Sequence, residues 1–384
     1  MDLKRSRSLL SVTIIFFWAS EYCHAPYFTP YLQTLGFSAG LIGVITGTYG
    51  FTQMCIRIPL GMWTDASGNY KRTILMGTVF TTVSSFGLIF ATHPATIILC
   101  RFLAGAAAST WLAFTILYNA YYAADDSVHA MTNVNAFNSA GKLLAFVLGL
   151  ITASLWGYRV PLVCSFLTGV VAIVCAARLK PIPLRHEPFR VSQAVTVLRS
   201  PAVLCASLFA VVMQFFLQGT VFSFTSGVAK DLGASAFQIG VSTVLFTLVQ
   251  IAGAGFLGKH LLKKLSTARS VLLGCVLMSL SCVLVALARS IWLIWLAQVL
   301  GGIGNLAMSA VLMAMVVRHT PQERQSTAMG LFQALYGIGM AAGPVCVGQI
   351  VNAQGYAAAY LAVAAVTALA AAAAPWLIGR ADRA

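Results

Sequence analysis

Long apolar runs separated by short polar stretches dominate the pattern of residues along the chain. A helix needs about 20 consecutive apolar residues to cross the hydrocarbon core of a bilayer, and the runs reach that length. Glycine, proline and charged residues punctuate them. The pattern predicts twelve membrane-spanning helices, at residues 9–33, 40–62, 72–92, 96–122, 131–156, 159–178, 202–229, 237–258, 270–288, 291–317, 327–352 and 356–378. We therefore expect an all-α membrane protein.

Composition supports this expectation and excludes a soluble globular protein. Hydrophobic residues make up 59% of the 384 residues, charged residues make up 9%, and the mean hydropathy is +0.86. Soluble domains carry charge on about a quarter of their residues. Nearly the whole chain is therefore expected to lie within the membrane.

The distribution of positive charge predicts the orientation. With the N-terminus placed in the cytoplasm, 18 of the 24 Lys and Arg residues fall in inner segments and three fall in outer loops. Inner loops of membrane proteins carry such an excess, so we expect a plasma (inner) membrane protein with both termini cytoplasmic. The net charge of +15 is thereby explained without a nucleic-acid partner, and we expect a monomer.

The two halves of the sequence repeat at an offset of 197 residues. Seven of the ten residues at 35–44 are identical to their counterparts at 232–241, and the register continues into the later helices as an offset of 198. Six spans separate equivalent positions, so both copies have the same orientation in the membrane and form parallel repeats. We predict a six-helix bundle at 1–178, a cytoplasmic linker at 179–200 and a second bundle at 201–384.

Two short motifs make the chain resemble the major facilitator superfamily. Residues 61–72 read GMWTDASGNYKR, which resembles the superfamily signature between its second and third helices. Residues 101–105 read RFLAG, which is similar to the helix 4 motif of the drug/proton antiporter branch. The resemblance covers essentially the whole chain. It implies a twelve-helix transporter fold, and it implies proton-driven efflux as the activity.

The first motif also predicts a conformational latch. An Asp beside closely packed glycines can hold the N–H groups of a neighbouring helix end and release them when the bundles rock. The predicted latch residues are Asp65, Gly61, Gly68 and Arg72. The alternative interpretation is an acid in a solvated loop.

Three ionisable residues are predicted to lie deep in the bilayer, all in the first half. Glu21, the one acid in the predicted spans, falls about 18 Å from the inner surface, with Lys142 and Arg101 in a similar layer. Buried charges are costly and usually face a cavity or one another. We predict that Glu21, His24 and Arg101 couple transport to protons. A permanent ion pair of Glu21 and a structural His24 are the alternatives.

Polar and aromatic residues at comparable depths predict the solute site. Amides are costly to bury without partners, so they favour a cavity. The predicted solute-binding residues are Lys142, Tyr27, Trp111, Asn135, Asn138, Gln214, Gln218, Gln298, Asn305, Gln333 and Tyr336.

The motifs exclude several other functions. The sequence has no metal-ligand spacing, nucleophile elbow or phosphate-binding loop, so we expect no cofactor, no metal and no enzymatic activity. Arg101 and Lys142 exceed the single acid in the deep layer, which favours an anionic or zwitterionic solute. The sequence predicts a proton-coupled exporter of a small amphipathic compound. The alternatives are proton symport of an organic anion, a lipid scramblase and an intramembrane enzyme.

Overall fold

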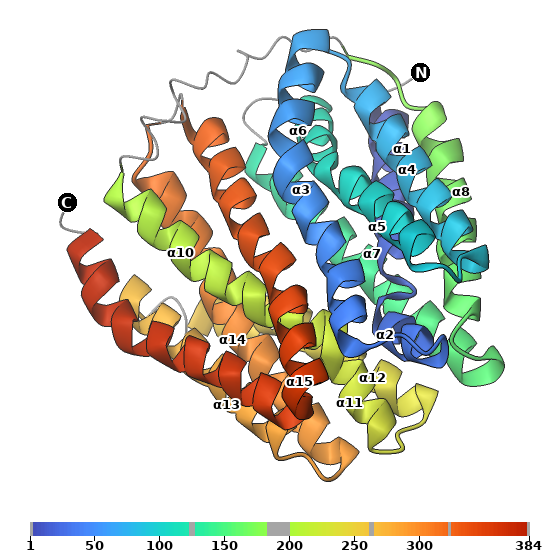
Figure 1. Cartoon of the computed structure of the whole chain (residues 1–384). Helices are drawn as coiled ribbons and strands as arrows, with labels where there is room; N and C mark the ends of the chain where they lie inside the picture. The colour runs from blue at the N-terminus through green and yellow to red at the C-terminus, as the bar shows by residue number, and fades with distance from the viewer. Residues whose placement is uncertain (1–2, 123–126, 183–199, 261–264, 322–323, 382–384) are drawn as a thin grey trace. The chain divides into compact units, whose positions relative to one another are not determined.

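The computed structural model describes residues 3–122, 127–182, 200–260, 265–321 and 324–381. The regular elements within these ranges are all helices (Figure 1). Ten stretches of the described chain are long and apolar enough to cross a membrane. One of them, Thr327–Ala381, contains two helices separated by a kink, and the helices that precede Ala39 fall outside the ten. The predicted all-α membrane fold is confirmed, and twelve spans are consistent with it.

The first half of the chain contains eight described helices, several of which are pieces of one predicted span. They are α1 (Leu3–Tyr22), α2 (Ala25–Thr34), α3 (Ala39–Ser67), α4 (Tyr70–Phe90), α5 (Pro94–Ser109), α6 (Trp111–Ala120), α7 (Ser127–Trp156) and α8 (Val160–Ala177). Most of the predicted linker, residues 183–199, lies outside the described residues.

The second half begins with an irregular span and ends with a bent one. Its elements are α10 (Pro201–Phe216), the π-helix η2 (Leu217–Phe224), α11 (Thr225–Asp231), α12 (Ala236–His260), α13 (Thr267–Ala286), α14 (Ile291–Arg318) and α15 (Gln325–Ala381). Figure 1 shows the two limbs of α15, and the kink between them comes at Gly355, where φ is 84°.

The chain groups into two compact units. The N-terminal unit comprises Met1–Tyr31 and Cys55–Phe189, and the C-terminal unit comprises Leu32–Met54 and Arg190–Ala384. The first part of α3 therefore packs within the C-terminal unit. There Gly43 lies so close to the Pro344 carbonyl and to Gly348 on α15 that a Cβ would not fit.

The predicted repeat is visible in the packing of each unit. Ser84 on α4 donates a hydrogen bond to the Cys100 carbonyl (2.7 Å), and Ser281 on α13 donates one to the Ala297 carbonyl (2.8 Å). The two donors are 197 residues apart in the sequence, and so are the two acceptors. The same offset relates Asn69 and Ser266, which cap the N-termini of α4 and α13. Hydrogen bonds at equivalent positions show that the two bundles share this part of their internal packing.

The first predicted helix is broken, and Pro26 explains where. We expected one helix over 9–33, but α1 ends at Tyr22 and α2 begins at Ala25. Proline has no N–H, and its ring clashes with the carbonyl four residues earlier, which is that of Tyr22. The break thus leaves His24 between two helices and Glu21 in the last turn of α1.

The equivalent helix of the second half is irregular at the same place. We expected one α-helix over 202–229, but residues 217–224 form the π-helix η2. Subtracting 197 places this stretch at residues 20–27, over the break between α1 and α2. Gln218 is the counterpart of Glu21 and lies in η2. π-Helical segments are rare and concentrate at functional sites.

Two further boundaries differ from the predictions. The span expected at 96–122 is divided at Thr110 into α5 and α6. Helix α3 continues to Ser67, five residues beyond the predicted end at 62, so Asp65 is helical rather than in a loop. Gly68 ends the helix because its φ of 62° lies in the left-handed region, and its N–H donates to the Thr64 carbonyl.

Candidate functional site

Lys142 lies beside two aromatic rings of α1. Its Nζ is 5.1 Å from the centroid of the Trp18 ring and 5.0 Å from that of Tyr22. Both distances are within the range of a cation–π interaction, about 6 Å. Among the described residues the ammonium contacts these two rings and no hydrogen-bond acceptor. An ammonium has three N–H donors, so this one can donate hydrogen bonds to an anionic group without breaking an existing hydrogen bond.

The preceding glycine brings Lys142 to this position. A methyl group added at Gly141 would lie 2.5 Å from the Ile15 carbonyl oxygen and 3.0 Å from the Trp18 Cβ. Helix α7 therefore approaches the α1 backbone more closely than any larger residue would permit. The C-terminal unit repeats the arrangement, because Gly339 on α15 meets the Val211 carbonyl on α10.

Lys142 lies on a polar face of α7. Asn135 and Asn138 are 7 and 4 residues earlier, which at 100° per residue places all three within roughly 60° of one another. The exposed apolar residues Val147, Ile151 and Leu155 lie on the other side, centred roughly 180° away. An exposed apolar stripe is the face expected to meet lipid, so the face with Lys142 points away from lipid.

The break after α1 carries a second polar group. His24 is buried, and its Nδ1 lies 2.9 Å from the Ser165 hydroxyl on α8. The His24 ring also packs edge-on against Phe28 with centroids 5.4 Å apart. Arg101 lies over the same Phe28 ring at 5.2 Å. The structure thus brings His24 and Arg101 to one aromatic ring, and Glu21, which is 5% exposed, is three residues from His24.

Four predicted amides lie in the C-terminal unit, two on α14 and two around the junction of α10 and η2. Gln298 and Asn305 are buried and lie on the face of α14 that includes Gly301. A methyl group at Gly301 would lie 3.0 Å from the Phe216 ring. Gln214 and Gln218 are each two residues from Phe216, which at 100° per residue places them on the side of the helix away from the Phe216 ring. The Oδ1 of Asn305 and the Oε1 of Gln214 have no hydrogen-bond partner among the described residues.

The other predicted solute residues occupy more varied positions. Trp111, the first residue of α6, packs edge-on against Trp18 at 5.2 Å. Tyr27 is fully buried and stacks on Tyr158 at 6.0 Å, so its ring serves packing in this conformation. Gln333 and Tyr336 are half-buried on α15, where the Tyr336 ring packs edge-on against Phe332 with centroids 5.6 Å apart.

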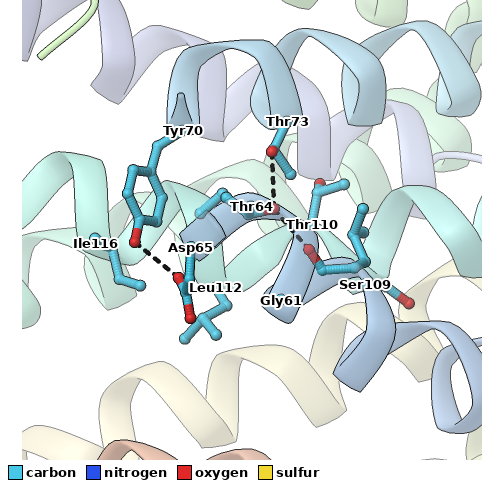
Figure 2. Close-up of a pocket in the computed structure, with 11 residues that line it drawn as sticks. Gly61, Thr64, Asp65, Tyr70, Thr73, Ser109, Thr110, Leu112 and Ile116 are labelled. Carbon is cyan, nitrogen blue, oxygen red and sulfur yellow. Dashed lines mark hydrogen bonds between the residues drawn. The ribbon is translucent and has the colours of Figure 1, made fainter. Parts of the chain in front are cut away.

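Two of the four predicted latch residues, Gly61 and Asp65, line a small pocket where α3, α4 and the α5–α6 junction meet (Figure 2). The Tyr70 hydroxyl donates to the Asp65 carboxylate over 2.8 Å. Arg72 is elsewhere, with its guanidinium 5.6 Å from the Trp63 ring centroid. Asp65 therefore bonds to a tyrosine of its own unit rather than to the basic residue of the motif.

Sequence reasoning overlooked four residues that now frame the site. Trp18 and Tyr22 are four residues apart on α1, a spacing that places them on one helical face and was the available signal. Phe28 and Ser165 meet His24 through tertiary packing. Within the described ranges, no group of three or more His, Cys, Asp or Glu residues is placed to hold a metal ion.

Comparison with known proteins identifies the family. The model of the Major Facilitator Superfamily matches residues 10–226 and 204–384. The chain belongs to the Major Facilitator Superfamily. It is accordingly a membrane transporter of that type rather than an enzyme. Membership of the drug/proton antiporter branch stays a prediction.

Individual relatives agree with this assignment. An uncharacterised MFS-type transporter of Methanocaldococcus jannaschii is 25% identical over 348 residues, which is 88% of each chain. A crystal structure of the nucleoside transporter NupG has a TM-score of 0.78 and 16% identity, over 98% of this chain and 99% of that one. A crystal structure of the human organic anion transporter MFSD10 has a TM-score of 0.70 and 15% identity, over 98% of this chain and 100% of that one. The two structures show that the fold is shared.

Proposed function

We propose that this transporter is proton-coupled and carries a small amphipathic solute with an anionic or zwitterionic head, with export as its direction. The observation that carries the proposal is the Lys142 ammonium. It lies on the polar face of α7, contacts two aromatic rings, and meets no hydrogen-bond acceptor among the described residues. A carboxylate would supply the missing acceptor and would gain a charge-assisted hydrogen bond.

Glu21 is the proposed proton carrier. It is 5% exposed and lies in the last turn of α1, directly before the break. Discontinuous helices near the middle of the membrane are a recurring position for solute and coupling-ion sites in transporters. A buried carboxyl group binds or releases a proton when its burial or its charged neighbours change. His24 and Arg101, which share the Phe28 ring, are proposed to couple with it.

The two short sequence motifs support the export direction and the latch role. The direction of transport follows from the similarity of Arg101–Gly105 to the antiporter motif. The latch role of Asp65 is supported by its hydrogen bond with Tyr70, which joins the end of α3 to the start of α4. Such a contact can be exchanged for another when the helices move.

Proteoliposomes test the coupling. Glu21→Gln copies the amide that the repeat carries at Gln218, so it is expected to fold, to retain solute exchange at equal concentrations, and to lose accumulation driven by a pH gradient. Asp231→Asn, at the end of α11, is the matched control and is expected to keep gradient-driven transport. Gradient-driven accumulation by the Glu21 variant would refute the coupling role. Accumulation in the direction of proton flow would identify symport.

A further inference from the structure

Further aromatic rings pack against the two rings that contact Lys142. Trp18 contacts Trp111 at 5.2 Å and Tyr22 at 5.7 Å between ring centroids. Tyr22 also meets Phe146 at 5.9 Å, nearly perpendicular. These four rings form a continuous group, which we call the Lys142 aromatic cluster: Trp18, Tyr22, Trp111 and Phe146.

The members of the cluster differ in their exposure. Trp18 is 6% exposed and Phe146 is 1% exposed, so both serve packing. Tyr22 and Trp111 are partly exposed. Both contact Trp18, the ring over which the Lys142 ammonium lies. The partly exposed rings of Tyr22 and Trp111 are therefore separated from the Lys142 ammonium by at most the Trp18 ring. This ammonium has no hydrogen-bond acceptor among the described residues.

We propose that the solute is an aromatic carboxylate, whose carboxylate binds Lys142 while its ring packs against Tyr22 and Trp111. This inference rests on the proposed function and specifies the amphipathic part of its solute. A flat ring joined to the carboxylate by one or two atoms would reach both features. Aromatic pairs prefer edge-on or offset contacts with centroids about 4.5–7 Å apart, and they gain more than the burial of an equal saturated surface.

A matched pair of acids tests the inference. Phenylacetate and cyclohexylacetate share the carboxylate and the one-carbon spacer and differ in the aromaticity of the ring. Binding to the purified full-length protein in nanodiscs is measured by calorimetry. We expect phenylacetate to bind roughly 2- to 12-fold more tightly. Phenylacetamide, which keeps the ring but lacks the charge, is expected to bind weakly.

Variants assign the two effects to separate residues. Trp111→Leu is expected to reduce the preference for phenylacetate, because Tyr22 alone then supplies an aromatic contact, whereas Trp111→Phe is expected to keep the preference. Lys142→Gln is expected to weaken both acids, and Lys142→Arg to retain both. The matched controls are Trp376→Leu, on the exposed end of α15, and Lys71→Gln, whose ammonium bonds to the Ala177 carbonyl.

The possible results separate the two proposals. Equal binding of the two acids, with Lys142 dependence, would overturn the aromatic inference and leave the anionic solute standing. Binding of neither acid, or binding that is insensitive to Lys142→Gln in a folded variant, would overturn the proposed function as well. Tight binding of phenylacetamide would show that the ring rather than the charge is recognised, and it would also count against both.

Discussion

Replacing Gly141 by alanine perturbs the contact that positions Lys142. The added methyl group would lie 2.5 Å from the Ile15 carbonyl oxygen, whereas ordinary contact begins at 3.4 Å. Helix α7 must therefore move about 0.9 Å from α1, because the obstructing atom belongs to the backbone and cannot rotate away. Overpacking of this kind costs about 1–3 kcal/mol. The same shift would take the Lys142 ammonium from 5.0 Å to about 6 Å from the Tyr22 ring, the limit of a cation–π interaction.

The assay is equilibrium unfolding by SDS titration in mixed micelles, which gives the free energy of unfolding directly. Gly330→Ala, inside α15, is the control, since an added methyl group there has no atom within 4 Å. Alanine at such a helical position is expected to be neutral or to stabilise by about 0.5–1 kcal/mol. If Gly141→Ala unfolds with the wild-type free energy and retains wild-type affinity for acids, the close approach of α7 to α1 does not position Lys142.

Three further predictions test the repeat, the latch and the orientation. Ser84→Ala and Ser281→Ala remove equivalent hydrogen bonds, so each is expected to lower the free energy of unfolding by about 0.6 kcal/mol in SDS titrations. A loss of stability at one position alone would contradict their equivalence. Tyr70→Phe removes the donor to Asp65 and is expected to change the transport rate without changing solute affinity, measured from initial rates in proteoliposomes; altered affinity would argue against a latch. In a cysteine-free background, Ser67→Cys is expected to react with an impermeant maleimide in inverted vesicles and not in intact cells, and labelling of intact cells would reverse the predicted orientation.

Local pattern was sufficient for the architecture because a membrane-spanning backbone must satisfy its own hydrogen bonds. Within lipid the helix does so by itself, so an apolar run of sufficient length implies a helix whatever its neighbours are. The repeat needed only the comparison of the sequence with itself, and the matching contacts of Ser84 and Ser281 bear it out. Pro26 also marked the break after Tyr22, although the sequence prediction passed over it.

Tertiary structure decided what the deep residues face. Sequence placed Lys142 in the same layer as Glu21 and Arg101, yet depth along the membrane normal says nothing about rotation of a helix around its axis. That rotation depends on close approaches such as Gly141 against Ile15, which set Lys142 beside Trp18. The π-helix at 217–224 contains no proline, so the sequence carries no comparable signal for it. Side-chain partners therefore come from interhelical packing, which involves residues far apart in the sequence, whereas the helices themselves come from the chain's local composition.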